Sequence, residues 1–125
     1  MKQSNAALKK KLDSVFSLFI RHRDQGVCYT CGVQRMPSEM QAGHYISRTH
    51  LVIRWDEMNV KCQCPKCNLF MQGNAVSFRE HLVRDYGEDC VKVLEAKRFE
   101  TVKHDAEWYH KMIDHYRERL KVYEA

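Results

Sequence analysis

Four of the six cysteines stand in two Cys-x-x-Cys pairs, a spacing that is typical of a zinc site. Each pair can bring two thiolates to one tetrahedral ion, with zinc–sulfur bonds of about 2.3 Å. Four sulfurs leave no open position for water, so we expect this zinc to stabilise the fold and not to perform chemistry. The alternative, four unrelated buried thiols, seldom arises from random cysteine placement. The expected ligands are Cys28, Cys31, Cys64 and Cys67.

The other two cysteines, Cys62 and Cys90, are expected to be free. Cys62 lies two residues before the second pair, but a Cys-x-Cys step fits the turn of such a pair less well. The 32 residues between Cys31 and Cys64 exceed the roughly 15 to 20 of simple zinc ribbons. We therefore expect a further functional unit within this insert.

A histidine and two asparagines, His44, Asn59 and Asn68, follow one another in and just after the insert. This order resembles the HNH endonuclease motif of the ββα-metal superfamily. The resemblance implies that His44 is a general base at the end of the first strand, that Asn59 braces the hairpin loop and that Asn68 binds a divalent cation. Taken singly, each could be an ordinary histidine, turn or cap residue. Together with the flanking cysteine pairs, they favour the functional interpretation.

A longer series of short segments makes the resemblance more specific. These segments are Cys28–Gly32, Ala42–Tyr45, Arg54–Glu57, Asn59–Val60, Gln63–Cys64, Cys67–Asn68, Gly73–Asn74, Tyr86–Gly87 and Asp114–Arg117. Over about residues 10–123 the chain resembles the phage NinG (Rap) family of recombination endonucleases, which cut branched DNA such as Holliday junctions. The resemblance implies a metal-dependent, structure-selective DNA endonuclease in the cytoplasm of a phage-infected bacterium. The alternatives are a zinc-containing nucleic-acid-binding module without cleavage and an HNH nicking or restriction-type nuclease of other specificity.

These residue types suit phosphodiester hydrolysis, which needs a base for the attacking water and positive charge near the phosphate. A neutral histidine with a pKa near 6.5 can serve as the base. The amide oxygen of Asn68 suits Mg²⁺ or Mn²⁺, and Arg48 and Arg54 are candidates to hold phosphates. Many HNH enzymes carry an aspartate ligand immediately before the base, where this chain has Gly43. The second ligand stays open among Asp56, Asn74 and His81.

The elements that position these residues are indicated by hydrophobic spacing. Apolar residues from Leu8 to Phe19 predict a helix over about residues 5–22. Its outer side carries three candidate DNA contacts, Lys9, Lys10 and Lys11. The zinc-bound ββα core is expected over about residues 26–73. Its parts are a hairpin with long loops, read from the apolar pieces Met40–Ile46 and Leu51–Trp55, and a short helix over residues 65–72.

The C-terminal helices are expected over about residues 75–123. Asn74 is predicted to cap the first, and Ser77 with Glu80 has the spacing of a capping box. Val91 and Leu94 indicate a short helix, and an apolar stripe from Tyr109 to Tyr123 predicts a long one. The predicted fold class is α+β, with a zinc-stapled ββα-metal (HNH) core flanked by N- and C-terminal helices.

Length and charge restrict the remaining possibilities. A chain of 125 residues with 44% hydrophobic residues suits one domain over residues 1–125 and contains no membrane span. Residues 1–79 carry 12 basic and 5 acidic side chains, a balance of +7, whereas residues 80–125 carry 9 and 11, a balance of −2. This asymmetry is compatible with nucleic acid as the partner and equally with a merely solvated charged face.

A homodimer is expected, because resolving a four-way junction takes two nicks and each chain supplies one His44. The apolar stripe of the final helix could be the dimer seam or simply core. The N-terminal helix is the other candidate for the contact, but we favour the C-terminal one and expect charged residues at Tyr116 and Leu120 to yield a monomer.

Overall fold

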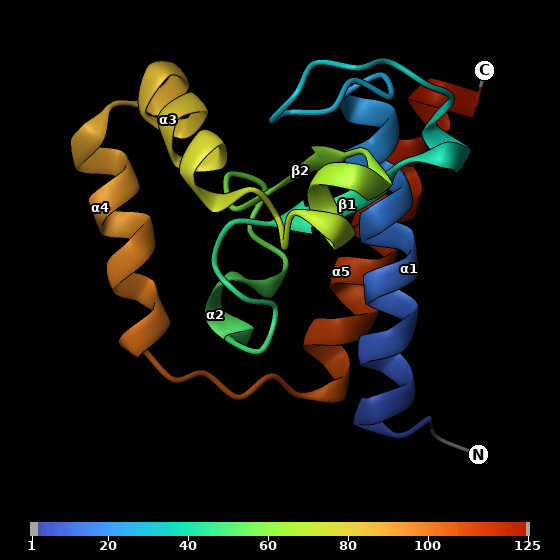
Figure 1. Ribbon diagram of the computed structural model, residues 1–125. Helices are drawn as coiled ribbons and strands as arrows, with labels where there is room; N and C mark the ends of the chain where they lie inside the picture. The colour runs from blue at the N-terminus through green and yellow to red at the C-terminus, as the bar shows by residue number, and fades with distance from the viewer. Residues whose placement is uncertain (1–2, 125) are drawn as a thin grey trace.

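The computed structural model describes residues 3–124 and shows a mixed α+β chain built around a small antiparallel sheet. The sheet pairs β1 (Gln41–His44) with β2 (Val60–Gln63). It lies at the centre of Figure 1, between the pair α1 and α5 on one side and the pair α3 and α4 on the other. Within the described residues, no helix is long and apolar enough to cross a membrane.

Two long helices form the largest core. α1 (Asn5–Arg23) begins at Ser4, whose hydroxyl accepts a hydrogen bond from the amide of Ala7 at 3.1 Å and so satisfies a free N–H of the first turn. α5 (Ala106–Glu124) runs along α1 (Figure 1). Both predicted helices are confirmed. Their buried residues recur at helical spacing and are Leu8, Leu12, Phe16, Phe19, Ile20, Tyr109, Ile113, Tyr116 and Leu120.

The apolar stripe of α5 is therefore core of the same chain. The ring of Tyr116 lies 4.9 Å from that of Phe16 and 5.1 Å from that of Phe19, measured between centroids. Tyr116 is 3% exposed and Leu120 4% exposed. The prediction that two chains meet through Tyr116 and Leu120 is wrong, because α1 already covers this face.

The hairpin differs from its predicted form in its second strand. Leu51–Trp55, expected to be the second apolar piece of the hairpin, instead contains the short helix α2 (Leu51–Arg54), and the second strand is Val60–Gln63. The helix allows Ile53 and Trp55 to enter two different cores. β2 did not look like a buried strand in the sequence because Lys61 and Gln63 are polar, although they are only 6% and 0% exposed.

Two shorter helices cover the other side of the hairpin. α3 (Ala75–Tyr86) and α4 (Glu88–Ala96) share an apolar core with Ile53 of α2. Asn74 lies at the N-cap position of α3, as predicted, but its backbone is left-handed with φ of 51° and its side chain makes no capping hydrogen bond. The remaining elements are single turns at Pro37–Glu39, Lys66–Phe70 and Lys97–Phe99, of which Lys66–Phe70 (η2) is a π-helical turn in place of the predicted helix over residues 65–72.

Candidate functional site

The four paired cysteines converge on one point. Their Sγ atoms all lie within 4.8 Å of one another, and those of Cys31 and Cys64 are 3.6 Å apart. A tetrahedral zinc ion with bonds of about 2.3 Å requires sulfurs roughly 3.8 Å apart. The donor set and its spacing therefore fit a zinc ion. We call Cys28, Cys31, Cys64 and Cys67 the four-cysteine cluster.

The backbone around each pair shapes this cluster. The amide of Gly32 donates to the carbonyl of Cys28 at 2.9 Å, and the amide of Asn68 donates to the carbonyl of Cys64 at 3.0 Å. Gly32 has a φ of +82°, which an L side chain rarely adopts, so a glycine is needed after the first pair. Cys62 is buried on β2 outside the cluster, as predicted, and Cys90 is exposed on α4.

Gln63 links the cluster to β1 and was not identified as a site residue from the sequence. Its amide nitrogen donates to the hydroxyl of Thr30 at 3.0 Å and to the carbonyl of Gly73 at 2.8 Å. Its Oε1 atom is buried without a hydrogen-bond partner among the described residues and lies over Gly43. A Cβ on residue 43 would come within 1.8 Å of that oxygen. An aspartate therefore cannot stand before His44 in this packing.

His44 is the last residue of β1 and is half-buried. Its Nε2 atom lies 2.8 Å from the carbonyl oxygen of Arg54. A carbonyl can only accept, so Nε2 carries the hydrogen and the neutral ring has its lone pair on Nδ1. Burial lowers the pKa of His44 below its ordinary value; the charges of Arg48 and Arg54 act in the same direction, whereas the Arg54 carbonyl and Asp13 act against it. His44 is thus a neutral imidazole at pH 7.

The carbonyl that orients His44 is itself held from α1. Asp13 accepts hydrogen bonds from Nε of Arg54 at 3.0 Å and from the indole nitrogen of Trp55 at 3.0 Å. Arg54 also packs over the Trp55 ring, with 5.3 Å from its guanidinium carbon to the centroid. The long helical pair therefore fixes the position of α2 and, through the Arg54 carbonyl, that of His44. Asp13 was missed from the sequence because an isolated aspartate on a helix gives no signal.

Asn59 is fully buried and braces the loop that follows His44. Its Oδ1 accepts from the amide of Ile46 at 2.8 Å, and its Nδ2 donates to the carbonyls of Ile46 at 3.0 Å and Ile53 at 3.1 Å. The amide of Tyr45 in turn donates to the Asn59 carbonyl at 2.9 Å. The Asn59 side chain thus joins the loop after β1 to α2. Its two partners are Ile46, which is two residues after His44, and Ile53, which directly precedes Arg54.

Asn68 lies on η2 and meets the opposite end of β1. Its Nδ2 donates to Oε1 of Gln41 at 2.6 Å. Gln41 and His44 are three residues apart on the strand, a rise of about 10 Å, so Asn68 contacts the strand that carries His44 without being paired to His44. Gln41 is a second amide beside Asn68 that sequence reasoning missed, because a glutamine at the start of a strand is commonplace.

The three residues left open as second cation ligand all have other partners. Asp56 accepts from the amide of Met58 at 2.8 Å within the turn before β2. Asn74 Nδ2 lies 3.9 Å from Sγ of Cys67, and His81 Nδ1 lies 2.6 Å from the carbonyl of Tyr29. The hydrogen bond of the Asn68 side chain among the described residues goes to Gln41 and to none of these three.

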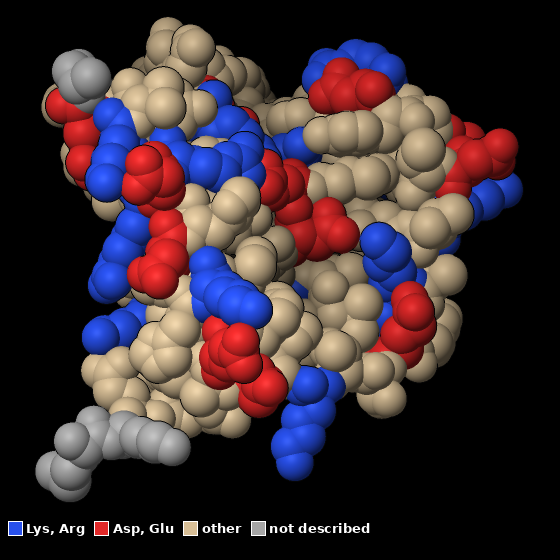
Figure 2. Space-filling model, turned by 180° about the vertical axis from the view of Figure 1, so that it is seen from behind, with Lys and Arg blue, Asp and Glu red and all other residues tan. Residues whose placement is uncertain are grey.

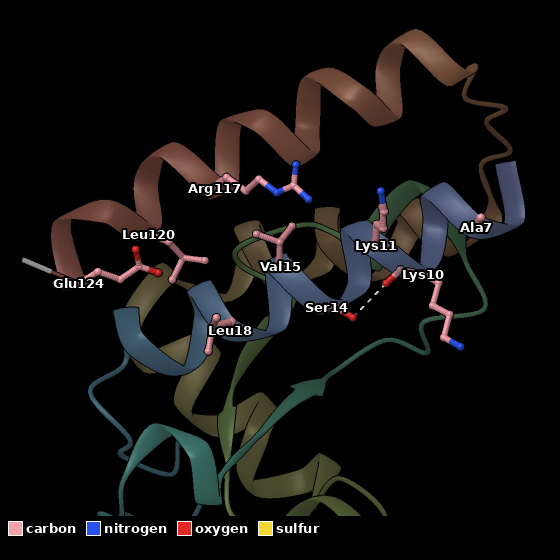
Figure 3. Close-up of a pocket in the computed structure, with 9 residues that line it drawn as sticks. All are labelled: Ala7, Lys10, Lys11, Ser14, Val15, Leu18, Arg117, Leu120 and Glu124. Atoms are coloured by element: carbon pink, nitrogen blue, oxygen red, sulfur yellow. Dashed lines mark hydrogen bonds between the residues drawn. The ribbon is translucent and has the colours of Figure 1, made fainter. Parts of the chain in front are cut away.

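The basic residues expected to contact DNA differ in their exposure and in whether an acidic residue already binds them. Arg54 is bound by Asp13 with 16% of its side chain exposed, whereas Arg48 shares Asp13 at 2.8 Å but is 58% exposed. Lys9 is half-buried, and Lys10 and Lys11 are exposed. Lys10, Lys11 and Arg117 all line a groove between α1 and α5; the amine of Lys11 extends towards α5, and that of Lys10 points outwards (Figure 3).

The rear face of the molecule has no continuous basic surface. Figure 2 shows lysine and arginine side chains interspersed with acidic ones over this face. The overall charge of +5 is therefore not concentrated there.

The sequence matches a known family along its whole length. The family model described as "Bacteriophage Lambda NinG protein" matches residues 1–125. The protein named "Protein ninG" of Escherichia phage 933W is 33% identical over 89 residues, which cover 70% of this chain and 44% of that protein. The proteins of the same name from Escherichia phage lambda and Salmonella phage P22 are 32% and 33% identical over 89 residues, with 70% of this chain and 43% of each relative covered.

The matched region thus spans less than half the length of these curated relatives. No solved structure is significantly similar.

Proposed function

The chain belongs to the NinG family, and from that premise we propose that it is a metal-dependent, structure-selective DNA endonuclease with an HNH-type (ββα-metal) site. The substrates we propose are branched recombination intermediates such as Holliday junctions. The observation that carries the proposal is the hydrogen bond from Nε2 of His44 to the Arg54 carbonyl. It leaves Nδ1 as the proton acceptor on a neutral ring, as a general base requires.

In the proposed reaction, Nδ1 of His44 accepts a proton from a water molecule whose oxygen attacks the phosphorus. A bond forms between that oxygen and phosphorus, the bond from phosphorus to the 3′ oxygen breaks, and the imidazolium keeps its hydrogen bond to Arg54. Asn59 holds the loop on which this geometry depends. For phosphate binding we propose Arg48, because it is the more exposed of the two arginines.

The residues that would hold the divalent cation are Asn68 and Gln41. Their amides are in contact, and both carry a carbonyl oxygen, a hard donor that suits Mg²⁺ or Mn²⁺. Because the Asn68 amide can rotate by half a turn, both oxygens can face one cation. When bound, the cation supplies positive charge for the crowded phosphate and the leaving oxygen. The four-cysteine cluster supports the same segment, since Cys67 immediately precedes Asn68, and we propose zinc there as a structural ion.

The proposal is tested with labelled four-way junction, flap and linear duplex, with and without Mg²⁺ or Mn²⁺. Native protein is expected to cut branched DNA only with added cation. His44→Ala and Asn68→Ala should lose at least about a hundredfold in rate and keep their affinity for junctions, because base and cation act in the chemical step. Because burial lowers the pKa of His44, the rate should fall only at pH values below its ordinary pKa of about 6.5.

The matched control is His110→Ala, which removes an exposed histidine on α5. It should cut at the native rate. If native protein binds junctions under every cation condition and cuts none, the zinc-containing binding module becomes the better description. If His44→Ala cuts as fast as native protein, the HNH assignment is refuted. Concerted double cutting further requires two sites, so we propose a homodimer whose contact lies outside the α1–α5 pair.

A further inference from the structure

Three consecutive apolar side chains project from the end of η2. Leu69 is 58% exposed, Phe70 83% and Met71 46%. Phe70 is the most exposed large hydrophobic residue among residues 3–124, and 69–71 is the longest run of such residues there. We call Leu69, Phe70 and Met71 the apolar tip. Leaving a phenylalanine in water forgoes a favourable burial term, so a run of this kind marks a contact surface.

The apolar tip is mounted on a well-held segment. The amide of Gly73 donates to the carbonyl of Cys67 at 2.9 Å, and the carbonyl of Gly73 accepts from Gln63 at 2.8 Å. The amide of Met71 closes the π-helical turn onto the Lys66 carbonyl at 2.9 Å. The tip is therefore held on both sides in the sequence: Cys67 of the four-cysteine cluster precedes it, and Gly73, which is bonded to the buried Gln63 of β2, follows it. The backbone that carries its side chains is therefore held in place before any partner binds.

Its position beside Asn68 and Lys66 identifies the partner. Phe70 is two residues from Asn68, the proposed cation ligand, and Lys66 in the same turn is exposed. A phosphate held at Asn68 would place the bases of its strand, spaced about 3.4 Å apart, alongside the tip. A second copy of the chain is a poorer fit, because three side chains cannot provide the roughly 800 Å² that each partner contributes to a stable protein interface.

We propose that the apolar tip is a wedge that stacks on an unstacked DNA base at a branch point. Phenylalanine, leucine and methionine are the side chains that proteins insert between base steps. In continuous duplex this insertion must first break base stacking, which costs a few kcal/mol, whereas bases at a branch are already partly unstacked. The wedge would thus make binding selective for branched DNA. This inference rests on the proposed function and assigns its shape selectivity to Phe70.

The test compares Phe70→Ala with Phe70→Trp, which keeps an aromatic face, and with Phe99→Ala as matched control. Phe99 is 78% exposed but lies after α4 with Arg98 over its ring at 4.9 Å. Affinity is measured for a four-way junction and for a linear duplex, and 2-aminopurine at the branch reports stacking. Phe70→Ala should weaken junction binding about tenfold or more, leave duplex binding within about twofold and abolish the 2-aminopurine response. Phe70→Trp and Phe99→Ala should behave as native protein.

Several outcomes would overturn the wedge. Equal loss of affinity for junction and duplex in Phe70→Ala, or an unchanged 2-aminopurine response, contradicts base stacking. A change in sedimentation from dimer to monomer in Phe70→Ala, with junction binding retained, identifies a second chain as the occupant. The endonuclease proposal can be refuted on its own. If native protein binds junctions through Phe70 but never cuts them, the wedge is supported and the proposed cleavage is refuted. If native protein binds neither DNA, both are refuted.

Discussion

The α1–α5 pair and the hairpin region are buried to a similar depth but are held together by opposite kinds of side chain. Between the two helices the buried residues are aliphatic or aromatic, and close packing is their main contribution. Around the hairpin the buried residues include Asn59, Lys61 and Gln63, together with the four-cysteine cluster. The first region tolerates approximate geometry, whereas the second depends on individual hydrogen bonds and on a proposed metal.

The two regions meet through Trp55 and Val60, which pack into the core of the helical pair, and through a few polar contacts. Asp13 of α1 holds Arg54 and Trp55, and Arg23 at the end of α1 donates to the carbonyls of Glu57 at 3.0 Å and Val60 at 2.9 Å. The helical pair therefore works as a rigid platform for the loop that contains the His44 partner. The comparison indicates that the packing of the helical pair and the hydrogen bonds around His44 can be disturbed separately.

The largest expected effect is the loss of stability on removing the proposed zinc, which only the hairpin region would bind. Cys64→Ser should lose the cooperative unfolding transition, because a structural zinc contributes about 10 kcal/mol, comparable with the roughly 5–15 kcal/mol of total stability. A strong chelator should do the same to native protein. Thermal unfolding by near-ultraviolet circular dichroism measures both.

Cys90→Ser is the control, since Cys90 is exposed on α4 and outside the four-cysteine cluster. It should unfold as native protein does and retain one zinc ion per chain by elemental analysis. A Cys64→Ser protein as stable as Cys90→Ser would contradict a structural zinc and reduce the difference between the two regions to one of polarity.

The second effect addresses the helical pair. Phe16 is 2% exposed and its ring meets that of Tyr116. Phe16→Ala should cost about 3–5 kcal/mol in free energy of unfolding, measured in urea, through lost burial and the cavity that remains. Zinc content should stay unchanged in the folded protein. A loss below about 1 kcal/mol would mean that α1 and α5 do not pack as described.

The helical pair is also the part that the sequence predicted well. Leu8, Leu12, Phe16 and Phe19 repeat at helical spacing because one face is uniformly apolar, and α1 and α5 begin and end close to the predicted residues. The spacing could not say whether α5 covers α1 of the same chain or of another, since the apolar pattern is the same in both cases.

In the hairpin region, the reactive and metal-binding residue types allowed a correct prediction, whereas the hydrophobic pattern did not. The cysteine spacing identified the four residues that converge, and Asn59 was expected to brace the loop that it does contact. β2 was not predicted because two of its buried residues are polar, and their burial depends on partners that are distant in the sequence. Asp13 and Gln41 were missed for the same reason: each matters through contacts with residues distant in sequence, which local sequence does not encode.

The smallest predicted effect concerns the packing of β1 against β2. A methyl group on residue 43 would lie 1.8 Å from Oε1 and 2.6 Å from Cδ of Gln63. The Gln63 side chain is fully buried and its nitrogen is tied to Thr30 and Gly73, so it can move only by breaking those hydrogen bonds. Gly43→Ala should therefore cost about 1–3 kcal/mol in free energy of unfolding.

A double-mutant cycle in urea isolates the cause. Gln63→Ala alone removes two hydrogen bonds and leaves a small cavity, but in Gly43→Ala/Gln63→Ala the new methyl group has room. If the clash is the cause, the double variant loses less than the sum of the two single losses, by about 1 kcal/mol or more. Strict additivity would show that Gly43 matters for another reason, such as backbone freedom. In that case the hairpin would tolerate approximate packing as the helical pair does, and the contrast between the two regions would lie in the four-cysteine cluster alone.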